Sequence, residues 1–357
     1  MEGFFDNLEN WKKHWKNMPE FVQGDGMPYK TIQVHFSDAA DLQDFSEKIG
    51  QKVNENTKYI YHPKQVKENL LSKKCEGSGN PRYPVFIPTK GRWEKRYTIK
   101  MFEKMGVPYT AVIEKQEYEE YAKVINPENL LVVPHQNKGL TETRNWIWDY
   151  AQKQGHKYFW TFDDNIKDIY RLNRNMKYRC STGQPLFILE EFTLRFSNLY
   201  ISGMQYEMFA PRKYKMPVFI ENTRIYSNML IKTDIPYRNK LFYNDDTDLC
   251  LQVLKDGFCT ILHNSFLIDK ETTMQQKGGM TDFYEETNNR KEFAEELIKA
   301  HPDVVKLTKK FGRFHHQVNY QPFKKNKLKY KKSYVEKDVI NEFGLKITNN
   351  ENRKRRT

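Results

Sequence analysis

Short apolar runs alternate with amphipathic stretches through the middle of the chain. Four runs have the length of buried strands and lie at residues 85–87, 109–113, 130–133 and 158–162. The stretches between them repeat apolar residues at helical spacing. They predict a helix over 93–105, an acidic helix that follows the second run and ends at about 124, and a helix over 140–154. Strands that alternate with helices along a chain form mostly parallel sheets. The pattern therefore predicts an α/β fold with an open, mostly parallel sheet flanked by helices.

The first 80 residues follow a different pattern and predict a small N-terminal α+β module. Apolar residues recur at helical spacing from Phe4 to Trp15 and predict a helix over residues 1 to about 28, and residues 31–36 alternate as a half-buried strand does. Ser37 and Asp38 suit the N-terminus of a helix that reaches Ile49, and residues 57–61 predict a second strand. The glycines and prolines of residues 73–84 predict a domain boundary near residue 80.

Three oxygen-bearing side chains follow the apolar run 158–162, namely Asp163, Asp164 and Asn165. In open α/β sheets, ligands bind beyond the carboxyl ends of the strands. Carboxylate and amide oxygens suit Mg²⁺ or Mn²⁺ better than zinc, and such an ion can hold a phosphorylated substrate. The same residues also suit a turn or a helix cap. This segment alone leaves both interpretations open.

A second acidic segment, with Asp245, Asp246 and Asp248, precedes an amphipathic helix that stops at Gly257. Acidic residues in a first helical turn complement the helix dipole, which is one interpretation of Asp245 and Asp248. A carboxylate can also act as the general base for a hydroxyl nucleophile. Around this segment the pattern predicts strands over 217–223, 226–231 and 258–262 and a turn over 202–206.

The charge balance is strongly basic, with 59 lysines and arginines, 46 acidic residues and a formal net charge of +13. This balance favours an anionic partner, and we expect nucleic acid rather than a membrane because no apolar run approaches the ~20 residues of a membrane span. Basic and aromatic residues interleave at 170–179 and 212–215, which suits either phosphate contacts and base stacking or a solvated basic surface. Residues 311–357 predict a basic C-terminal tail.

The four cysteines have no CxxC spacing, which predicts neither a zinc site nor a disulfide framework. The first residues lack the apolar segment of a secretion signal. Together these features predict a reducing, cytoplasmic setting.

Residues 138–145 followed by residues 158–165 resemble the core of a GT-A nucleotide-sugar glycosyltransferase, in which a glycine-rich loop, an Arg-Asn pair and an acidic strand end occur in that order. With residues 85–92 included, the chain resembles the TET/JBP-associated glycosyltransferases, the group that contains the base J glucosyltransferase and many bacteriophage members. The resemblance implies a GT-A domain over residues 81–310, between the N-terminal module and the basic tail.

The resemblance also implies site residues. Asp246 has the place of the base that takes the proton of the acceptor hydroxyl. The implied ligands of a Mn²⁺ or Mg²⁺ ion, with Asn165 in place of the second Asp of a DxD motif, are Asp163, Asp164, Asn165 and His263. The residues implied to bind the donor are Pro88, Thr89, Lys90, Arg92, Gly139, Arg144 and Lys277.

The implied function is that of an inverting, metal-dependent glycosyltransferase. It would move a sugar from a UDP-sugar, with UDP-glucose as the first expectation, to a hydroxymethylated pyrimidine such as 5-hydroxymethylcytosine in double-stranded DNA, in the cytoplasm of a phage-infected cell. Two alternatives stay open. One is a Mg²⁺-dependent nuclease that uses both acidic segments. The other, which Asn165 favours, is a degenerate GT-A domain that serves as a DNA-binding or scaffold module.

Overall fold

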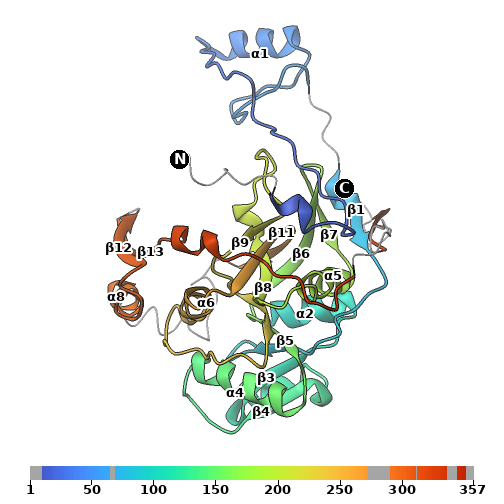
Figure 1. Ribbon diagram of the computed structural model, residues 1–357. Helices are drawn as coiled ribbons and strands as arrows, with labels where there is room; N and C mark the ends of the chain where they lie inside the picture. The colour runs from blue at the N-terminus through green and yellow to red at the C-terminus, as the bar shows by residue number, and fades with distance from the viewer. Residues whose placement is uncertain (1–9, 65–68, 272–289, 311, 336–343, 351–357) are drawn as a thin grey trace.

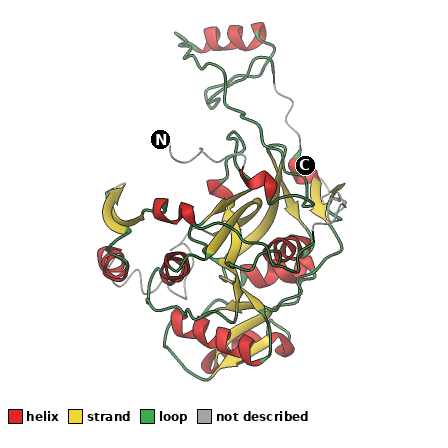
Figure 2. Cartoon of the chain, in the orientation of Figure 1, coloured by secondary structure: helices red, strands yellow, loops and turns green. Residues whose placement is uncertain are grey.

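The computed structural model describes residues 10–64, 69–271, 290–310, 312–335 and 344–350. Its strands form one twelve-stranded mixed sheet and a separate hairpin (Figures 1 and 2). The strands are β1 (Lys73–Glu76), β2 (Val85–Pro88), β3 (Thr110–Glu114), β4 (Leu130–Val133), β5 (Tyr158–Phe162), β6 (Ile166–Asn173), β7 (Met176–Cys180), β8 (Leu199–Tyr206), β9 (Phe219–Glu221), β10 (Asn228–Lys232), β11 (Cys259–Lys270), β12 (Val305–Lys310), β13 (Arg313–Val318) and β14 (Lys346–Asn349).

The α-helices connect or flank these strands. They are α1 (Ala39–Lys48), α2 (Tyr97–Met105), α3 (Tyr118–Ala122), α4 (Leu140–Lys153), α5 (Gln184–Thr193), α6 (Asp245–Lys255) and α8 (Arg290–Ala300). Short 3₁₀ turns are η1 (Asn10–Lys13), η2 (Leu70–Ser72), η3 (Lys115–Glu117), η4 (Pro127–Asn129), η5 (Glu207–Phe209) and η6 (Gln321–Lys325).

The main sheet has the order β14-β1-β7-β6-β11-β8-β10-β5-β2-β3-β4, and β9 pairs with β11. The run β5-β2-β3-β4 is parallel throughout, as the alternation of strands and helices predicts. Beyond β5 the strands are mixed, since β10 runs antiparallel to both β5 and β8. The predicted α/β class and the helix-flanked open sheet are confirmed.

The alternation of side chains along β5 separates two hydrophobic cores. Trp160 and Phe162 pack into the core that also contains residues of α2 and α5. Phe159, from the opposite face of the strand, packs with Trp148 of α4 and with residues of α6. All five residues of β5 are buried. Helices therefore cover both faces of the sheet, and the end of β5 emerges between two packed layers.

The segment predicted to turn at residues 202–206 is instead the second half of β8, which corrects that prediction. Gly203 lies so close to β10 that an added Cβ would be 2.1 Å from the carbonyl oxygen of Asn228. The Asn228 side chain also receives the backbone N–H of Met204 at 2.6 Å. Glycine here permits close approach of two strands, so a turn-forming residue type marks a tight strand contact.

The N-terminal region differs from the predicted βαβ-like module. Helix α1 forms, and Asp38 caps it by accepting the backbone N–H of Asp41 at 2.9 Å. Residues 31–36 and 57–61, however, form no strand, and of residues 10–28 only the 3₁₀ turn η1 is helical, so the two strand predictions and the described part of the helix prediction are wrong. Figure 1 shows α1 standing away from the sheet. Upstream of it, Trp15, Met18 and Phe21 are buried in the main core.

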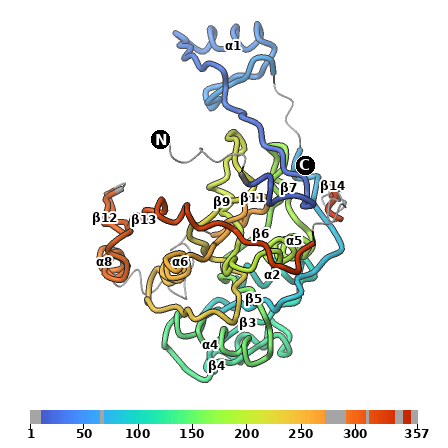
Figure 3. Tube along the Cα trace, in the orientation of Figure 1, coloured from blue at the N-terminus to red at the C-terminus, as the bar shows by residue number. Residues whose placement is uncertain are grey.

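The described residues after 310 also pack against the domain. Tyr330 places its hydroxyl 3.0 Å from His14 Nδ1, so segments from the two ends of the chain lie side by side (Figure 3). Strand β14 pairs with β1 at the edge of the main sheet. The boundaries at residues 80 and 310 stay predictions. Within the part of the chain that the structure describes, no helix is long and apolar enough to cross a membrane.

Candidate active site

Asp163 lies immediately after β5 and has a cationic partner on each carboxylate oxygen. Arg144 of α4 donates from Nη2 to Oδ1 at 2.8 Å, and Lys270 of β11 donates from Nζ to Oδ2 at 2.7 Å. Burial alone would raise the pKa of Asp163, but the charges of Lys270 and Arg144 outweigh it and hold that pKa well below its usual range. Asp163 is therefore ionised at neutral pH.

Asp164 has a separate set of partners, from the loop after β2. Thr89 donates from Oγ1 to Asp164 Oδ2 at 2.9 Å, and Arg92 forms an ion pair with Oδ1. The hydroxyl of Tyr121 lies 2.8 Å from Thr89 Oγ1 and accepts the backbone N–H of Arg92 at 3.1 Å. Burial raises the pKa of Asp164 in spite of the opposing charge of Arg92. The structure thus joins the predicted donor loop to the end of β5.

Arg144 also brings the two acidic segments together. Its Nη1 donates to Asp245 Oδ2 at 2.6 Å, so one buried guanidinium links β5 to α6. The next residue, Asp246, is half-buried, and its Oδ1 accepts the backbone N–H of Thr247 at 2.6 Å. Burial raises the pKa of Tyr226, and the nearby charge of Asp246 adds to this effect. Asp245 is therefore an ion-pair partner, whereas Asp246 is the accessible carboxylate of the segment.

The remaining donor-site candidates in the described residues lie at the same edge of the sheet. Pro88 ends β2, and Lys90 Nζ lies 2.9 Å from Oε2 of Glu114, the last residue of β3. Asn137 contacts both Lys90 and Glu114, and Gly139 begins α4 with φ of 88°. The loops after three neighbouring parallel strands therefore meet, which is where nucleotides bind in open α/β sheets.

His263 is not brought to this site, which corrects its proposed place beside the carboxylates. The side chain is fully buried, and its ring packs against Trp15, Phe192 and Phe219 at centroid distances of 5.9, 5.1 and 6.1 Å. Burial lowers the pKa of His263 to about 3. Residue type had suggested a ligand, but position on β11 makes His263 a core residue. Lys277 lies outside the described residues.

Three further residues of the site are not among the predicted site residues, namely Tyr206, Ser227 and Lys270. Lys270 Nζ contacts Ser227 Oγ at 2.7 Å and the Tyr206 hydroxyl at 3.4 Å, in addition to Asp163. The sequence does contain a signal for Lys270. A second apolar triplet, 266–268, follows the predicted strand 258–262 after three polar residues and ends in Asp269 and Lys270, just as the run before Asp163 ends in polar residues. A prediction that followed this strand beyond residue 262 would have placed Lys270 at the sheet edge.

The described side chains offer few unshared ligands to a divalent ion. Asp163 and Asp164 each have both carboxylate oxygens in contact with protein donors. Asn165 is buried, and within the described chain its Oδ1 has no hydrogen-bond partner, so it offers one neutral oxygen. Mg²⁺ and similar ions are normally held through carboxylates. Across the same residues, no three His, Cys, Asp or Glu side chains converge as a metal site. As arranged, these residues do not fit a resident divalent ion.

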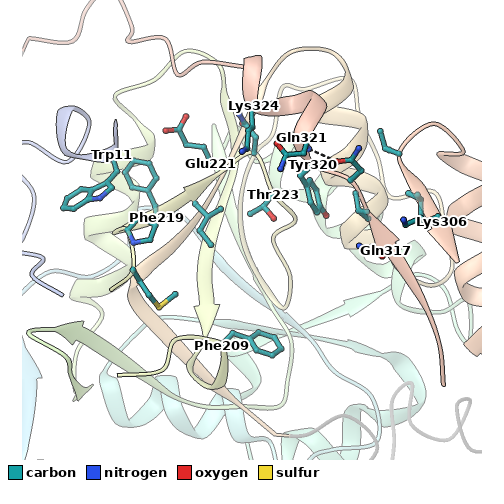
Figure 4. Close-up of a pocket in the computed structure, with 18 of the residues that line it drawn as sticks. Trp11, Phe209, Phe219, Glu221, Thr223, Lys306, Gln317, Tyr320, Gln321 and Lys324 are labelled. Carbon is teal, nitrogen blue, oxygen red and sulfur yellow. Dashed lines mark hydrogen bonds between the residues drawn. The ribbon is translucent and has the colours of Figure 1, made fainter. Parts of the chain in front are cut away.

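A groove of 980 Å³ is lined in part by Phe209 of η5, three residues after Tyr206 (Figure 4). One wall is largely apolar and aromatic, and the other, from residues 302–306 and 317–327, is polar and basic. Phe209 and Tyr214 are 51% and 47% exposed, so their faces are accessible to a ligand. The aromatic and basic residues that line the groove are Trp11, Phe209, Tyr214, Phe219, Tyr320, Lys306, Lys324 and Lys327.

The groove is connected to the carboxylates through aromatic residues. The ring of Phe209 lies 5.7 Å from that of Tyr206, whose hydroxyl is 2.5 Å from Ser227 Oγ and 3.4 Å from Lys270 Nζ. Tyr206 also packs edge-on against Tyr226 at 4.3 Å. One aromatic side chain, Tyr206, therefore connects the groove to Lys270 and Ser227.

Comparison with known proteins agrees with this geometry. The family model described as TET-Associated Glycosyltransferase matches residues 83–279, which is more than half of the chain and includes both acidic segments and Lys270. No curated protein matches the chain. The resemblance predicted from the motifs is thus confirmed. The chain belongs to the TET-associated glycosyltransferase family and is a nucleotide-sugar-dependent glycosyltransferase.

Proposed function

We propose that this enzyme transfers a sugar from a UDP-sugar to the hydroxyl group of a hydroxymethylated pyrimidine in DNA, with inversion at the anomeric carbon. The observation that carries the proposal is the convergence on Arg144 of Asp163, at the end of β5, and Asp245, the neighbour of Asp246. A donor-side strand end and an acceptor-side carboxylate are thereby adjacent. Family membership supports a nucleotide-sugar donor and a modified DNA base as acceptor.

Asp246 is proposed as the general base. The acceptor oxygen forms a bond to the anomeric carbon while the bond from that carbon to the β-phosphate oxygen breaks, and its electron pair leaves with UDP. The proton of the acceptor hydroxyl passes to the Asp246 carboxylate. Half-burial at the start of α6 keeps this carboxylate accessible, in contrast to Asp245. Attack from the face opposite the diphosphate inverts the configuration.

The donor is proposed to bind over the ends of β2, β3 and β5. Thr89, Arg92 and Lys90 surround this edge, and Arg144 lies beneath it. Their guanidinium and ammonium groups suit a diphosphate. The Mn²⁺ or Mg²⁺ ion implied by the motif stays a prediction from the sequence, and removal of divalent ions tests it.

The acceptor DNA is proposed to occupy the groove. Exposed Phe209 and Tyr214 suit stacking with bases, and Lys306, Lys324 and Lys327 suit contacts with phosphates (Figure 4). Its volume of 980 Å³ exceeds that of a single base, so a displaced nucleotide and part of its strand fit.

A mass-spectrometric screen tests the proposed function. UDP-glucose, UDP-N-acetylglucosamine and a UDP-pentose are each incubated with duplexes that contain 5-hydroxymethylcytosine, 5-hydroxymethyluracil or only ordinary bases. We expect a mass gain of one sugar per modified base and none in ordinary DNA. Cleavage of ordinary DNA would support the nuclease alternative, and UDP binding without turnover of any donor would support the scaffold alternative.

The groove has its own test. Phe209→Ala and Lys327→Ala should raise the KM for modified DNA several-fold while the KM for the UDP-sugar changes little, because only the acceptor uses this surface. Lys104→Ala, an exposed lysine at the end of α2, is the matched control. Equal KM values for DNA in all three variants would place the acceptor elsewhere.

A further inference from the structure

Three carboxylates of the site form ion pairs with side chains of the protein itself. Asp163 is paired with Arg144 and Lys270, Asp164 with Arg92, and Asp245 with Arg144. Three acidic groups thus share three cations. A leaving diphosphate adds negative charge to this cluster, and the charge must be met when the bond to the sugar breaks.

Lys270 is the cation with the geometry for this role. It is the last residue of the buried strand β11, and its side chain is only 16% exposed. Three oxygens surround Nζ, namely Asp163 Oδ2 at 2.7 Å, Ser227 Oγ at 2.7 Å and the Tyr206 hydroxyl at 3.4 Å. The contact with Tyr206 is the longest, so a phosphate oxygen can replace it while the other two contacts hold the ammonium in place.

The charge of Lys270 is secure. Lysine is protonated at neutral pH, and Nζ lies 2.7 Å from the Asp163 carboxylate, an ion pair that favours the charged form. Lys270 therefore stays protonated throughout the physiological range. A fixed charge at a strand end needs no reorganisation during the reaction, which is the condition under which such a group is most effective.

We propose that the Lys270 ammonium, rather than a divalent ion, meets the negative charge of the leaving diphosphate. This inference rests on the proposed function and names the group that stabilises the leaving diphosphate in that reaction. As the bond from the anomeric carbon to the β-phosphate oxygen breaks, that oxygen takes the electron pair and accepts a hydrogen bond from Nζ. The acceptor proton goes to Asp246, and no further reactant is needed.

The first test is transfer in the absence of divalent ions. The wild-type protein is treated with a chelating resin, its metal content is measured, and single-turnover transfer is followed with excess EDTA and with added Mn²⁺ or Mg²⁺. We expect rates within a few-fold of each other. Loss of transfer in EDTA with recovery in Mn²⁺ would overturn the role of Lys270 and leave the proposed function intact. Transfer under none of these conditions would overturn the proposed function itself.

The second test removes the charge. Loss of one preorganised group that stabilises developing charge lowers kcat ~10²- to 10³-fold, and we expect this from Lys270→Ala. Ethylammonium ions should restore part of the lost rate, because they return a positive charge to the space that alanine leaves. Lys270→Arg should retain more activity than Lys270→Gln, which keeps a hydrogen-bond donor without the charge. Lys232→Ala is the matched control. Lys232 also forms an ion pair, with Asp234, but it lies at the end of β10 that is farther from Ser227 and the site.

These variants separate charge from structure. Melting temperatures identify any variant that does not fold, and the Gln and Arg variants then carry the comparison. A Gln variant as active as the wild type, or an Ala variant that ethylammonium does not improve, would overturn the proposal.

Discussion

Arg144 shows how one side chain can organise a site. It is buried, donates to Asp163 and Asp245, and joins segments about a hundred residues apart in the chain. Burial by itself would lower the pKa of Arg144, but the Asp245 and Asp163 charges outweigh it and raise that pKa. Removing one partner of a buried ion pair leaves an uncompensated charge, so these three residues act as a unit. Asp246 lies outside the unit and is available for chemistry.

Asp246→Asn is expected to remove catalysis without removing donor binding. Asparagine keeps the size of the side chain but cannot take the acceptor proton, and loss of a general base costs ~10²- to 10⁴-fold in kcat. Single-turnover transfer measures the rate, and calorimetry measures UDP-sugar affinity. The anomeric coupling in the NMR spectrum of the wild-type product should show a β-linkage from an α-linked UDP-hexose. A variant within a few-fold of wild type, or an α-linked product, would exclude Asp246 as the base.

His263 is expected to affect stability rather than metal binding. Its pKa in the folded state is about 3, against 6.5 for an unperturbed histidine. The unfolded chain therefore binds a proton as pH falls below 6.5 while the folded protein does not, so this residue makes the free energy of unfolding decrease between pH 6.5 and pH 3. The decrease is about 1.4 kcal/mol per pH unit, or roughly 3 kcal/mol by pH 4.5.

Denaturant unfolding at pH 7 and pH 4.5 tests this linkage. In His263→Phe, which places a third phenyl ring beside Trp15, Phe192 and Phe219, the difference in unfolding free energy between the two pH values should shrink by about that amount. Transfer activity should survive. An unchanged pH dependence, or loss of activity in a folded variant, would contradict the assignment of His263 to the core.

Helix α4 depends on the backbone of its N-cap residue, which precedes Leu140. Gly139 has φ of 88° and ψ of 174°, a region open almost only to glycine, and an added Cβ would lie 2.6 Å from the ring of Phe242. The helix presents Arg144 five residues later, so a shift at Gly139 moves the ion pairs of the site. Glycine at position 139 is thus required to position α4 and its Arg144, as well as to adopt this backbone conformation.

Gly139→Ala should destabilise the protein by ~1–3 kcal/mol and raise the KM for the UDP-sugar. The matched control is Gly155→Ala, which also has positive φ (78°) but has no neighbouring atom within 4 Å of the added Cβ. We expect the control to lose stability by about 1–2 kcal/mol and to keep its KM. Thermal unfolding and steady-state kinetics separate the two effects. A raised KM in both variants would show that the effect does not depend on the Phe242 contact.

The whole domain includes segments from both ends of the described chain. Asn326 donates from Nδ2 to the carbonyl oxygens of Leu254 at 2.8 Å and Phe258 at 2.9 Å, at the end of α6 and the start of β11. Leu328 is buried in the main core. A basic composition over 311–357 therefore does not by itself make this region a detachable tail.

Two truncations should have different results. Ending the chain after Phe323 removes Asn326 and Leu328, so we expect a lower melting temperature. Ending it after Asn350 removes Arg353, Lys354, Arg355 and Arg356, and we expect unchanged melting with a weaker salt dependence of DNA binding, since each lost phosphate contact reduces the slope of log K against log salt by about 0.9. Equal salt dependence in the chain that ends at Asn350 and in the full chain would exclude these four residues as DNA contacts.

Local pattern by itself determined the parallel half of the sheet and the polar residues at the ends of its strands. Strands β4 and β5 have the residues predicted for them, and α4 begins at the predicted residue and ends one residue early. Asp163, Thr89 and Arg92 follow buried strands, and such residues lie at the edge of a sheet, whereas Arg144 was implied by the family resemblance. Periodicity reports which side of an element is buried, and this information is contained in neighbouring residues.

Only the tertiary structure decided which charges meet. Lys270 and Asp163 are 107 positions apart, and their contact depends on strand order, since β11 reaches the site past β8 and β10. The same long-range packing enclosed His263 in aromatic rings and made residues 202–206 a strand. Burial and ion pairing are properties of the space around a side chain, and that space is built by residues from distant parts of the chain. Oxygen-bearing side chains at a strand end can be predicted from sequence, whereas the lysine and arginine side chains that pair with them cannot.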